Sequence, residues 1–173
     1  YLFASFKLKI HPKIILILLW LLAMIIIDPI GEFPINDDWA YAKNVHDLVV
    51  QHKFAVDAWP AMNLVSQTIY GSAFAACFGF SFTVLRLSVT LLAILSSLVL
   101  YDLIDKLSGN NKFTALFLTI TFCFSSLFCA LSFTFMTDIF FLSFIIFCVG
   151  AFVSYFATGK FMYYILFIFF CVL

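Results

Sequence analysis

Three carboxylates stand out because each lies at the end of a strongly apolar run. Asp37 and Asp38 are adjacent in the segment FPINDDWAYAKNVHDL, residues 33–48, and Asp138 ends the segment SFTFMTD, residues 132–138. Ionisable groups beside membrane-type segments cost free energy and commonly mark a functional site. A partly buried carboxylate beside another has its pKa raised by desolvation and like-charge repulsion, which is the tuning that a general base needs. The three acids are therefore candidates for proton-transfer chemistry.

Helix capping is the simpler interpretation of the same residues. Asn36, Asp37 and Asp38 all stand where the N-cap of a following helix would lie, and Asp138 could cap a helix of its own. Capping accounts for one acid of the pair and leaves the other unexplained, so we favour a functional role for Asp37 and Asp38. For Asp138 both interpretations stay open.

The composition indicates which kind of protein must position these acids. Hydrophobic residues make up 65% of the chain, aromatic residues 20% and charged residues only 10%, which is too little polar surface for a water-soluble domain. The apolar residues also form blocks near the length of roughly 17 to 25 residues that crosses a bilayer. The formal net charge of zero leaves no basic stripe for nucleic acid. We therefore expect an all-α integral membrane protein.

The apolar blocks predict a polytopic helical bundle. The first block follows Lys7, Lys9 and Lys13 and ends at Asp28, a pattern typical of a helix with a cytoplasmic N-terminus. A signal peptide is the alternative interpretation, but no small-residue cleavage site follows the block. The five cysteines lie in apolar blocks without metal-type spacing and are interpreted as small hydrophobic residues. The predicted spans are residues 14–30, 86–104, 113–131, 139–158 and 161–173.

Residues 31–85 are predicted to form an external loop that bears amphipathic juxtamembrane helices. Residues 63–80 are long enough to cross a membrane, but the positive-inside rule favours leaving them at the interface. In that arrangement the cytoplasmic side holds Lys7, Lys9, Lys13, Lys106, Lys112 and Lys160, and the outside holds Lys43, Lys53 and Arg86. Asp138 then lies on the same outer face as Asp37 and Asp38.

The chain begins without Met and stops inside an apolar block, so we interpret residues 1–173 as a single membrane domain that is incomplete at its C-terminus. The pieces NDDWAYA, FGFSFTVLRLS and LSFTFMTD, in this order, resemble the N-terminal part of the GT-C class of membrane glycosyltransferases. The resemblance is strongest to the protein mannosyltransferase and aminoarabinose transferase type, including the bacterial group that decorates lipopolysaccharide. It runs from about residue 14 to residue 158.

The resemblance implies a function at the outer face of the cell inner (plasma) membrane. Enzymes of this class move a sugar from a polyprenyl-phosphate carrier to a lipid, glycan or protein acceptor. By analogy Asp37 matches the catalytic carboxylate, Asp38 the second acid of the pair, and Asp138 the acid of the second external loop. Tyr41 matches an aromatic residue that commonly follows the pair. The fragment alone is expected to be inactive.

Further roles follow from the chemistry of the transfer. Arg86 could support the departing lipid phosphate, although an arginine that pairs with a loop carboxylate is the simpler interpretation. Trp59 could line a sugar pocket or belong to an interfacial aromatic belt. Oxygen ligands on the acids would suit Mg²⁺ or Mn²⁺, but no metal is firmly predicted. The alternative function is a transporter or channel subunit that uses Asp37, Asp38 and Asp138 to handle cations or protons.

Overall fold

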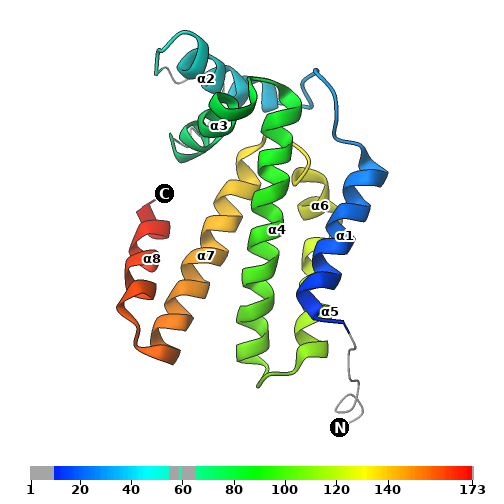
Figure 1. Cartoon of the computed structure of the whole chain (residues 1–173), viewed down its shortest axis with the longest axis vertical. Helices are drawn as coiled ribbons and strands as arrows, with labels where there is room; N and C mark the ends of the chain where they lie inside the picture. The colour runs from blue at the N-terminus through cyan, green and yellow to red at the C-terminus, as the bar shows by residue number, and fades with distance from the viewer. Residues whose placement is uncertain (1–9, 55–58, 60–64, 173) are drawn as a thin grey trace.

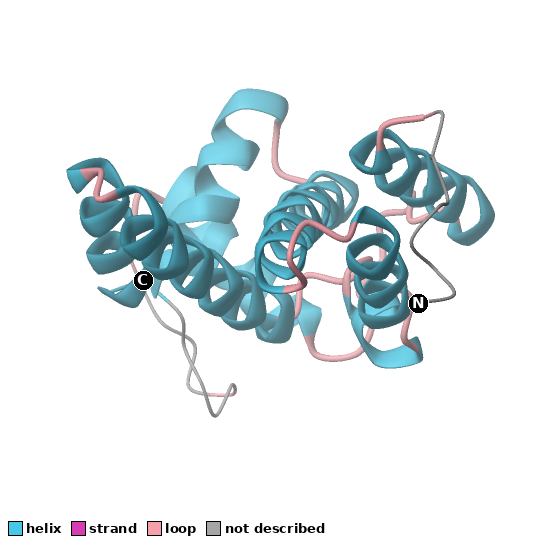
Figure 2. Cartoon of the chain, turned by 90° about the horizontal axis from the view of Figure 1, so that it is seen from below, coloured by secondary structure: helices cyan, strands magenta, loops and turns pink. Residues whose placement is uncertain are grey.

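The computed structural model describes residues 10–54, 59 and 65–172. These residues form helices and, within the described ranges, no strand (Figures 1 and 2). The helices are α1 (Pro12–Ile27), α2 (Asp38–Val50), α3 (Val65–Phe78), α4 (Phe82–Leu107), α5 (Lys112–Cys123), α6 (Ser126–Leu131), α7 (Thr137–Thr158) and α8 (Phe161–Val172). The prediction of an all-α bundle is confirmed.

The helices divide into a bundle and a cap. The helices α1, α4, α5, α7 and α8 run along the long axis of the molecule, whereas α2 and α3 lie together at one end (Figure 1). We call this end the cap: it comprises α2, α3, the loop of residues 28–37 and the N-terminal turns of α4 and α7. The opposite end, which we call the basic end, holds the starts of α1, α5 and α8 with Lys13, Lys106, Lys112 and Lys160.

Local signals in the sequence fix the helix ends. Pro12 occupies the first turn of α1, where its missing N–H is no loss, and the His11 side chain accepts a hydrogen bond from the Lys13 N–H. The Ser81 hydroxyl caps α4 by accepting from the Val84 N–H at 3.0 Å. The helix α7 ends at Gly159, whose φ of 66° is the left-handed conformation that glycine adopts at no cost.

The core of the bundle is built around Trp20 of α1, which is fully buried. Its ring lies 5.1 Å from the ring of Phe124 and 6.0 Å from that of Phe133, between ring centroids. Its Nε1 donates to the hydroxyl of Ser97 on α4 at 3.2 Å, so the polar edge of the indole is satisfied inside the core. These contacts join the first helix to α4 and to the segment that leads into α7.

The structure refines the predicted spans. Among the described residues, α4 and α7 are long and apolar enough to cross a membrane, and α1, α5 and α8 are shorter apolar helices. The predicted span 113–131 is divided into α5 and α6, because Ser125 leaves the helical conformation (φ −61°, ψ 148°). Serine side chains compete with helical backbone hydrogen bonds, so two adjacent serines make a natural break. The helix α5, of 12 residues, rises only about 18 Å.

Most of the apolar stretch 63–80, which is long enough to cross a membrane, forms the helix α3 (Val65–Phe78). It begins at Val65 and lies in the cap beside α2 rather than along the bundle axis (Figure 1); residues 63 and 64 fall outside the described part. Gly71 allows this close packing, because a Cβ there would come within 2.9 Å of Val45 and 2.7 Å of the Phe135 ring. That this segment does not cross a membrane stays a prediction.

Candidate functional site

The loop 28–37 folds over the N-terminus of α4. The Glu32 carboxylate accepts hydrogen bonds from the Phe82 N–H at 3.0 Å and the Thr83 N–H at 3.4 Å. Slight burial raises the pKa of Glu32, but these hydrogen bonds outweigh it and hold the pKa below its usual value. The Thr83 hydroxyl accepts from the Gly31 N–H at 3.0 Å. A carboxylate at a helix N-terminus is favourable, so Glu32 ties the loop to the helix.

Arg86 also holds the loop of residues 28–37 in place. Its side chain is fully buried and donates to the backbone carbonyls of Gly31 at 3.1 Å, Pro29 at 3.4 Å and Phe33. Its guanidinium carbon also lies 5.0 Å from the centroid of the Phe33 ring and 5.7 Å from that of Phe82. The structure therefore places Arg86 as an internal brace of the loop. Its predicted role at the lipid phosphate stays a prediction.

Asp38 is the acid that faces Arg86. It is fully buried, and its Oδ1 accepts from the Ile35 N–H at 2.8 Å. Its Oδ2 lies 3.6 Å from Arg86 Nε, too far for a hydrogen bond. Burial raises the pKa of Asp38; the Ile35 N–H, the charge of Arg86 and the Phe135 N–H act in the opposite direction without cancelling the rise.

Asp37 differs from Asp38 in exposure and in hydrogen bonding. It is exposed, and although it occupies the N-cap position of α2, its side chain makes no capping hydrogen bond. Asn36 directly before it has a φ of 54°, so the chain turns sharply here and presents the Asp37 side chain outward. Simple side-chain capping therefore does not explain Asp37.

The second acidic segment reaches the same end of the molecule. The N–H of Phe135 faces the Asp38 carboxylate, and the Phe135 carbonyl accepts from Gln67 Nε2 of α3 at 2.9 Å. Asp138 lies exposed in the first turn of α7, shortly after Phe135. The segment between α6 and α7 is thus held against both cap helices. Asp37, Asp38 and Asp138 lie at one end of the molecule, and that this end is the outer face of a membrane stays a prediction.

Aromatic side chains lie beside the acids in the cap. The rings of Trp39 and Trp59 are 6.0 Å apart between centroids, and both side chains are exposed. Tyr41, one turn into α2, is half-buried against the core. Exposed tryptophan faces suit either sugar rings or a membrane interface. The structure therefore brings Trp39 and Trp59 next to the segment that carries Asp37.

Sequence reasoning missed Glu32 and Gln67, which hold the cap together. The contact of Glu32 with the start of α4 has no signal in the sequence, because nothing in the spacing indicates that two segments so far apart in the chain meet. Gln67 lies on the polar face of an apolar helix, and its buried amide reaches the Phe135 carbonyl. Within the described ranges, no group of three or more His, Cys, Asp or Glu side chains is placed to hold a metal ion.

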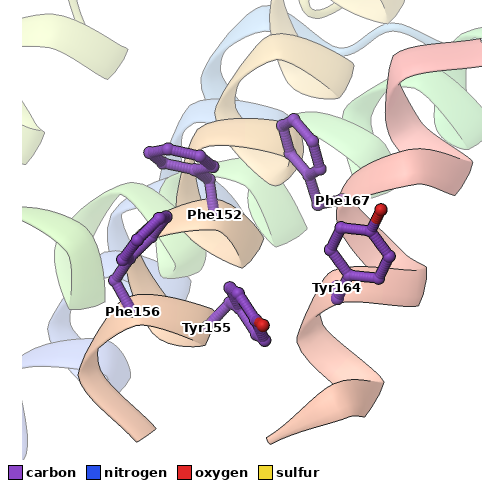
Figure 3. A pocket seen from close by; sticks show the side chains of 5 residues that line it. All are labelled: Phe152, Tyr155, Phe156, Tyr164 and Phe167. Atoms are coloured by element: carbon purple, nitrogen blue, oxygen red, sulfur yellow. The ribbon is translucent and has the colours of Figure 1, made fainter. Parts of the chain in front are cut away.

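Among the cavities lined by described residues, two lie away from the cap. The smaller, of about 110 Å³, is lined by Phe152, Tyr155 and Phe156 of α7 and by Tyr164 and Phe167 of α8 (Figure 3). These lining residues carry no charge, so the cavity is an aromatic seam between two helices rather than a place for acid–base chemistry. The larger, of about 570 Å³, lies between α1, α4, α7 and α8 and includes Lys13, Asp102 and Lys106.

No protein-family model, curated protein or solved structure matches the chain.

Proposed function

We propose that the chain is a multi-pass protein of the cell inner (plasma) membrane, with the cap on the outer face. Its polarity supports this, because small polar residues lie between the helices while large apolar residues point outward. The fully buried polar residues include Ser88, Ser96, Ser97, Thr119 and Ser143, and the exposed apolar residues include Leu91, Leu95, Phe141, Ile145 and Phe152.

The orientation of the bundle follows from its lysines. The basic end carries Lys13, Lys106, Lys112 and Lys160, whereas the exposed basic residues at the cap include Lys43 and Lys53. An excess of basic residues marks the cytoplasmic side of a membrane protein. The cap, with its three acids, then faces outward. Trp39 and Trp59 lie where an interfacial aromatic belt is expected.

Within this frame we propose that the cap belongs to a glycosyltransferase that moves a sugar from a polyprenyl-phosphate carrier to a lipid, glycan or protein acceptor. The observation that supports the proposal is the difference in burial between the two adjacent acids. Asp38 is buried and braced, whereas Asp37 is exposed with a free carboxylate on a fixed loop. A general base needs such a free carboxylate within reach of the proton that it removes.

The transfer assigns a step to each residue. The Asp37 carboxylate takes the proton of the acceptor hydroxyl, whose oxygen attacks the anomeric carbon as the bond to the lipid phosphate breaks. Asp38 and Arg86 act as positioning residues that hold the loop, and Trp39 and Trp59 offer faces for sugar rings. Asp138 would orient the acceptor from the start of α7.

The alternative, a transporter or channel subunit, has less support. Transporters bind their ions near the bilayer midplane, often at broken helices. The starts of α2 and α7, which carry Asp37, Asp38 and Asp138, instead lie at the end of the bundle. The buried polar groups further along α4 include the uncharged Ser96 and Ser97.

The proposal is tested by sugar transfer in proteoliposomes that contain the longest form of the chain its gene encodes. Polyprenyl-phosphate-linked mannose, glucose and aminoarabinose, each radiolabelled, are offered in turn with a membrane lipid extract as acceptor. We expect Asp37→Asn to lower the transfer rate by about 10²- to 10⁴-fold, because the base is lost without change of shape. The matched control is Asp28→Asn, since Asp28 is exposed at the same end and its left-handed conformation suits asparagine. Full transfer by Asp37→Asn, or equal losses in both variants, would contradict the assignment.

A further inference from the structure

We propose that the larger cavity at the basic end binds an anionic glycerophospholipid of the surrounding membrane leaflet. The cavity has a volume of about 570 Å³, within the size range of small-molecule sites. This proposal rests on the membrane insertion proposed above and is independent of sugar transfer. It concerns the end of the bundle opposite to Asp37.

The lining of the cavity changes from polar to apolar in the same direction on three helices. From the basic end inward the order is Lys106, Asp102, Val99 and Leu95 on α4, Ser154, Ala151 and Phe147 on α7, and Tyr163, Leu166 and Phe170 on α8. Along α4 this gradient covers about 16 Å. A membrane lipid has the same gradient, from a charged headgroup at the surface to a hydrocarbon chain inside. The cavity therefore matches a lipid in polarity as well as in place.

The charges at the polar end favour an anion. Lys13 is paired with Asp102 at 2.7 Å, so these two charges offset each other. Lys106 donates to the uncharged hydroxyl of Ser154 at 2.8 Å and forms no ion pair with any described residue. The lining therefore carries an excess positive charge, which is that of Lys106. A phosphate oxygen at Lys106 would receive a charge-assisted hydrogen bond.

Charge and membrane composition both favour an anionic phospholipid as the occupant. The cytoplasmic leaflet carries anionic phospholipids that are attracted to basic residues at its surface. Leu95, at the apolar end of the cavity, is 46% exposed, so an acyl chain can leave the cavity sideways into the bilayer. An apolar helix from elsewhere would fill the walls but leave Lys106 without an anion. Phosphatidylglycerol has both required parts.

The test compares lipids on the purified chain in a zwitterionic detergent. Dioleoylphosphatidylglycerol and dioleoylphosphatidylcholine are added in equal amounts, and the bound lipid is measured by native mass spectrometry. We expect the anionic lipid to be retained preferentially and Lys106→Gln to weaken its binding by about tenfold. Lys112→Gln is the matched control, because Lys112 is at the same end but does not line the cavity. It should leave binding unchanged.

A second measurement locates the lipid. A phosphatidylglycerol with a photoreactive group in its acyl chain should label peptides around Phe147 and Phe170, and labelling confined to other helices would overturn the proposal. Equal retention of both lipids, equal effects of the two lysine variants, or displacement by an equal amount of undecaprenyl phosphate would also overturn it. Resistance to alkaline carbonate extraction is measured on the membranes from which the chain is purified. Release of the chain by carbonate would refute membrane insertion itself, whereas insertion without lipid selectivity refutes only the lipid site.

Discussion

The two ends of the bundle both carry an ion pair between elements far apart in sequence, but they use it differently. At the cap, Arg86 and Asp38 are fully buried, and the strongest contacts of both side chains are with backbone groups of one loop. At the basic end, the side chains of Lys13 and Asp102 are 33% and 45% exposed, and they contact each other directly at 2.7 Å. The closer pair is therefore the more solvated one.

This difference shows that a short distance between charges is a poor guide to their importance. An exposed pair gains little because water screens it and because two flexible side chains must be held. A buried pair costs desolvation, and the loss of one partner leaves an uncompensated charge inside the protein. The cap pair is therefore expected to fix the shape of the loop that carries Asp37. The pair at the basic end is expected to act as a surface contact.

Replacing Arg86 by methionine should have the largest effect on stability. Arg86→Met removes the donors to Pro29, Gly31 and Phe33 and leaves Asp38 buried without a cation, so we expect a loss of about 3 to 5 kcal/mol in the free energy of unfolding. Thermal unfolding of the detergent-solubilised chain measures it.

The double variant Arg86→Met with Asp38→Asn separates the two causes of this loss. If the stranded carboxylate dominates, the double variant should be more stable than Arg86→Met alone. A loss below about 1 kcal/mol for Arg86→Met would show that the cap pair resembles an exposed one, and the contrast between the ends would fail.

The sequence predicts the helices better than the contacts between them. The helices of the bundle follow from apolar runs and from local caps such as Ser81 and Gly159, because these signals act over a few residues. The gathering of Asp37, Asp38 and Asp138 at one end follows from counting lysines. The burial of Asp38 and the exposure of Asp37 cannot be predicted in this way, because two adjacent acids are equivalent in sequence.

What decides between the two acids is contact across long stretches of chain. Asp38 is buried because the helix α4 brings Arg86 beneath it and because Phe135 arrives from the segment before α7. Similarly, the charge count predicts that α3 stays at the membrane interface, but it says nothing of the packing of α3, which depends on Gly71 facing Phe135 and Val45. Such contacts are properties of the folded arrangement and have no local pattern.

Replacing Asp38 by asparagine should change the pH dependence of stability. The pKa of Asp38 is raised in the folded chain by burial, so the folded state holds a proton that the unfolded state releases above about pH 4. Stability therefore falls as the pH rises from about 4 through the folded pKa, by at most about 1.4 kcal/mol per pH unit.

The asparagine side chain of the Asp38→Asn variant would keep an acceptor for the Ile35 N–H and would have no proton to lose. We expect this variant to melt with a flatter pH dependence than the unmodified chain, measured between about pH 4 and pH 8. Both chains share Glu32 and the other carboxylates, so the difference between the two profiles isolates Asp38. Identical profiles would show that the Asp38 proton is not linked to folding.

The smallest effect is expected at the basic end. Lys13→Gln removes the cation of the pair with Asp102, but both side chains are already partly in solvent, so the free energy of unfolding should fall by no more than about 1 kcal/mol. Added salt should have little further effect on the variant, whereas it should slightly destabilise the unmodified chain by screening the pair. The measurement is thermal unfolding in a zwitterionic detergent at low and high salt, which keeps anionic lipid out of the comparison. A loss as large as that of Arg86→Met would mean that Lys13 anchors α1 to α4 as firmly as Arg86 anchors the cap loop, and exposure would then no longer separate the two ends.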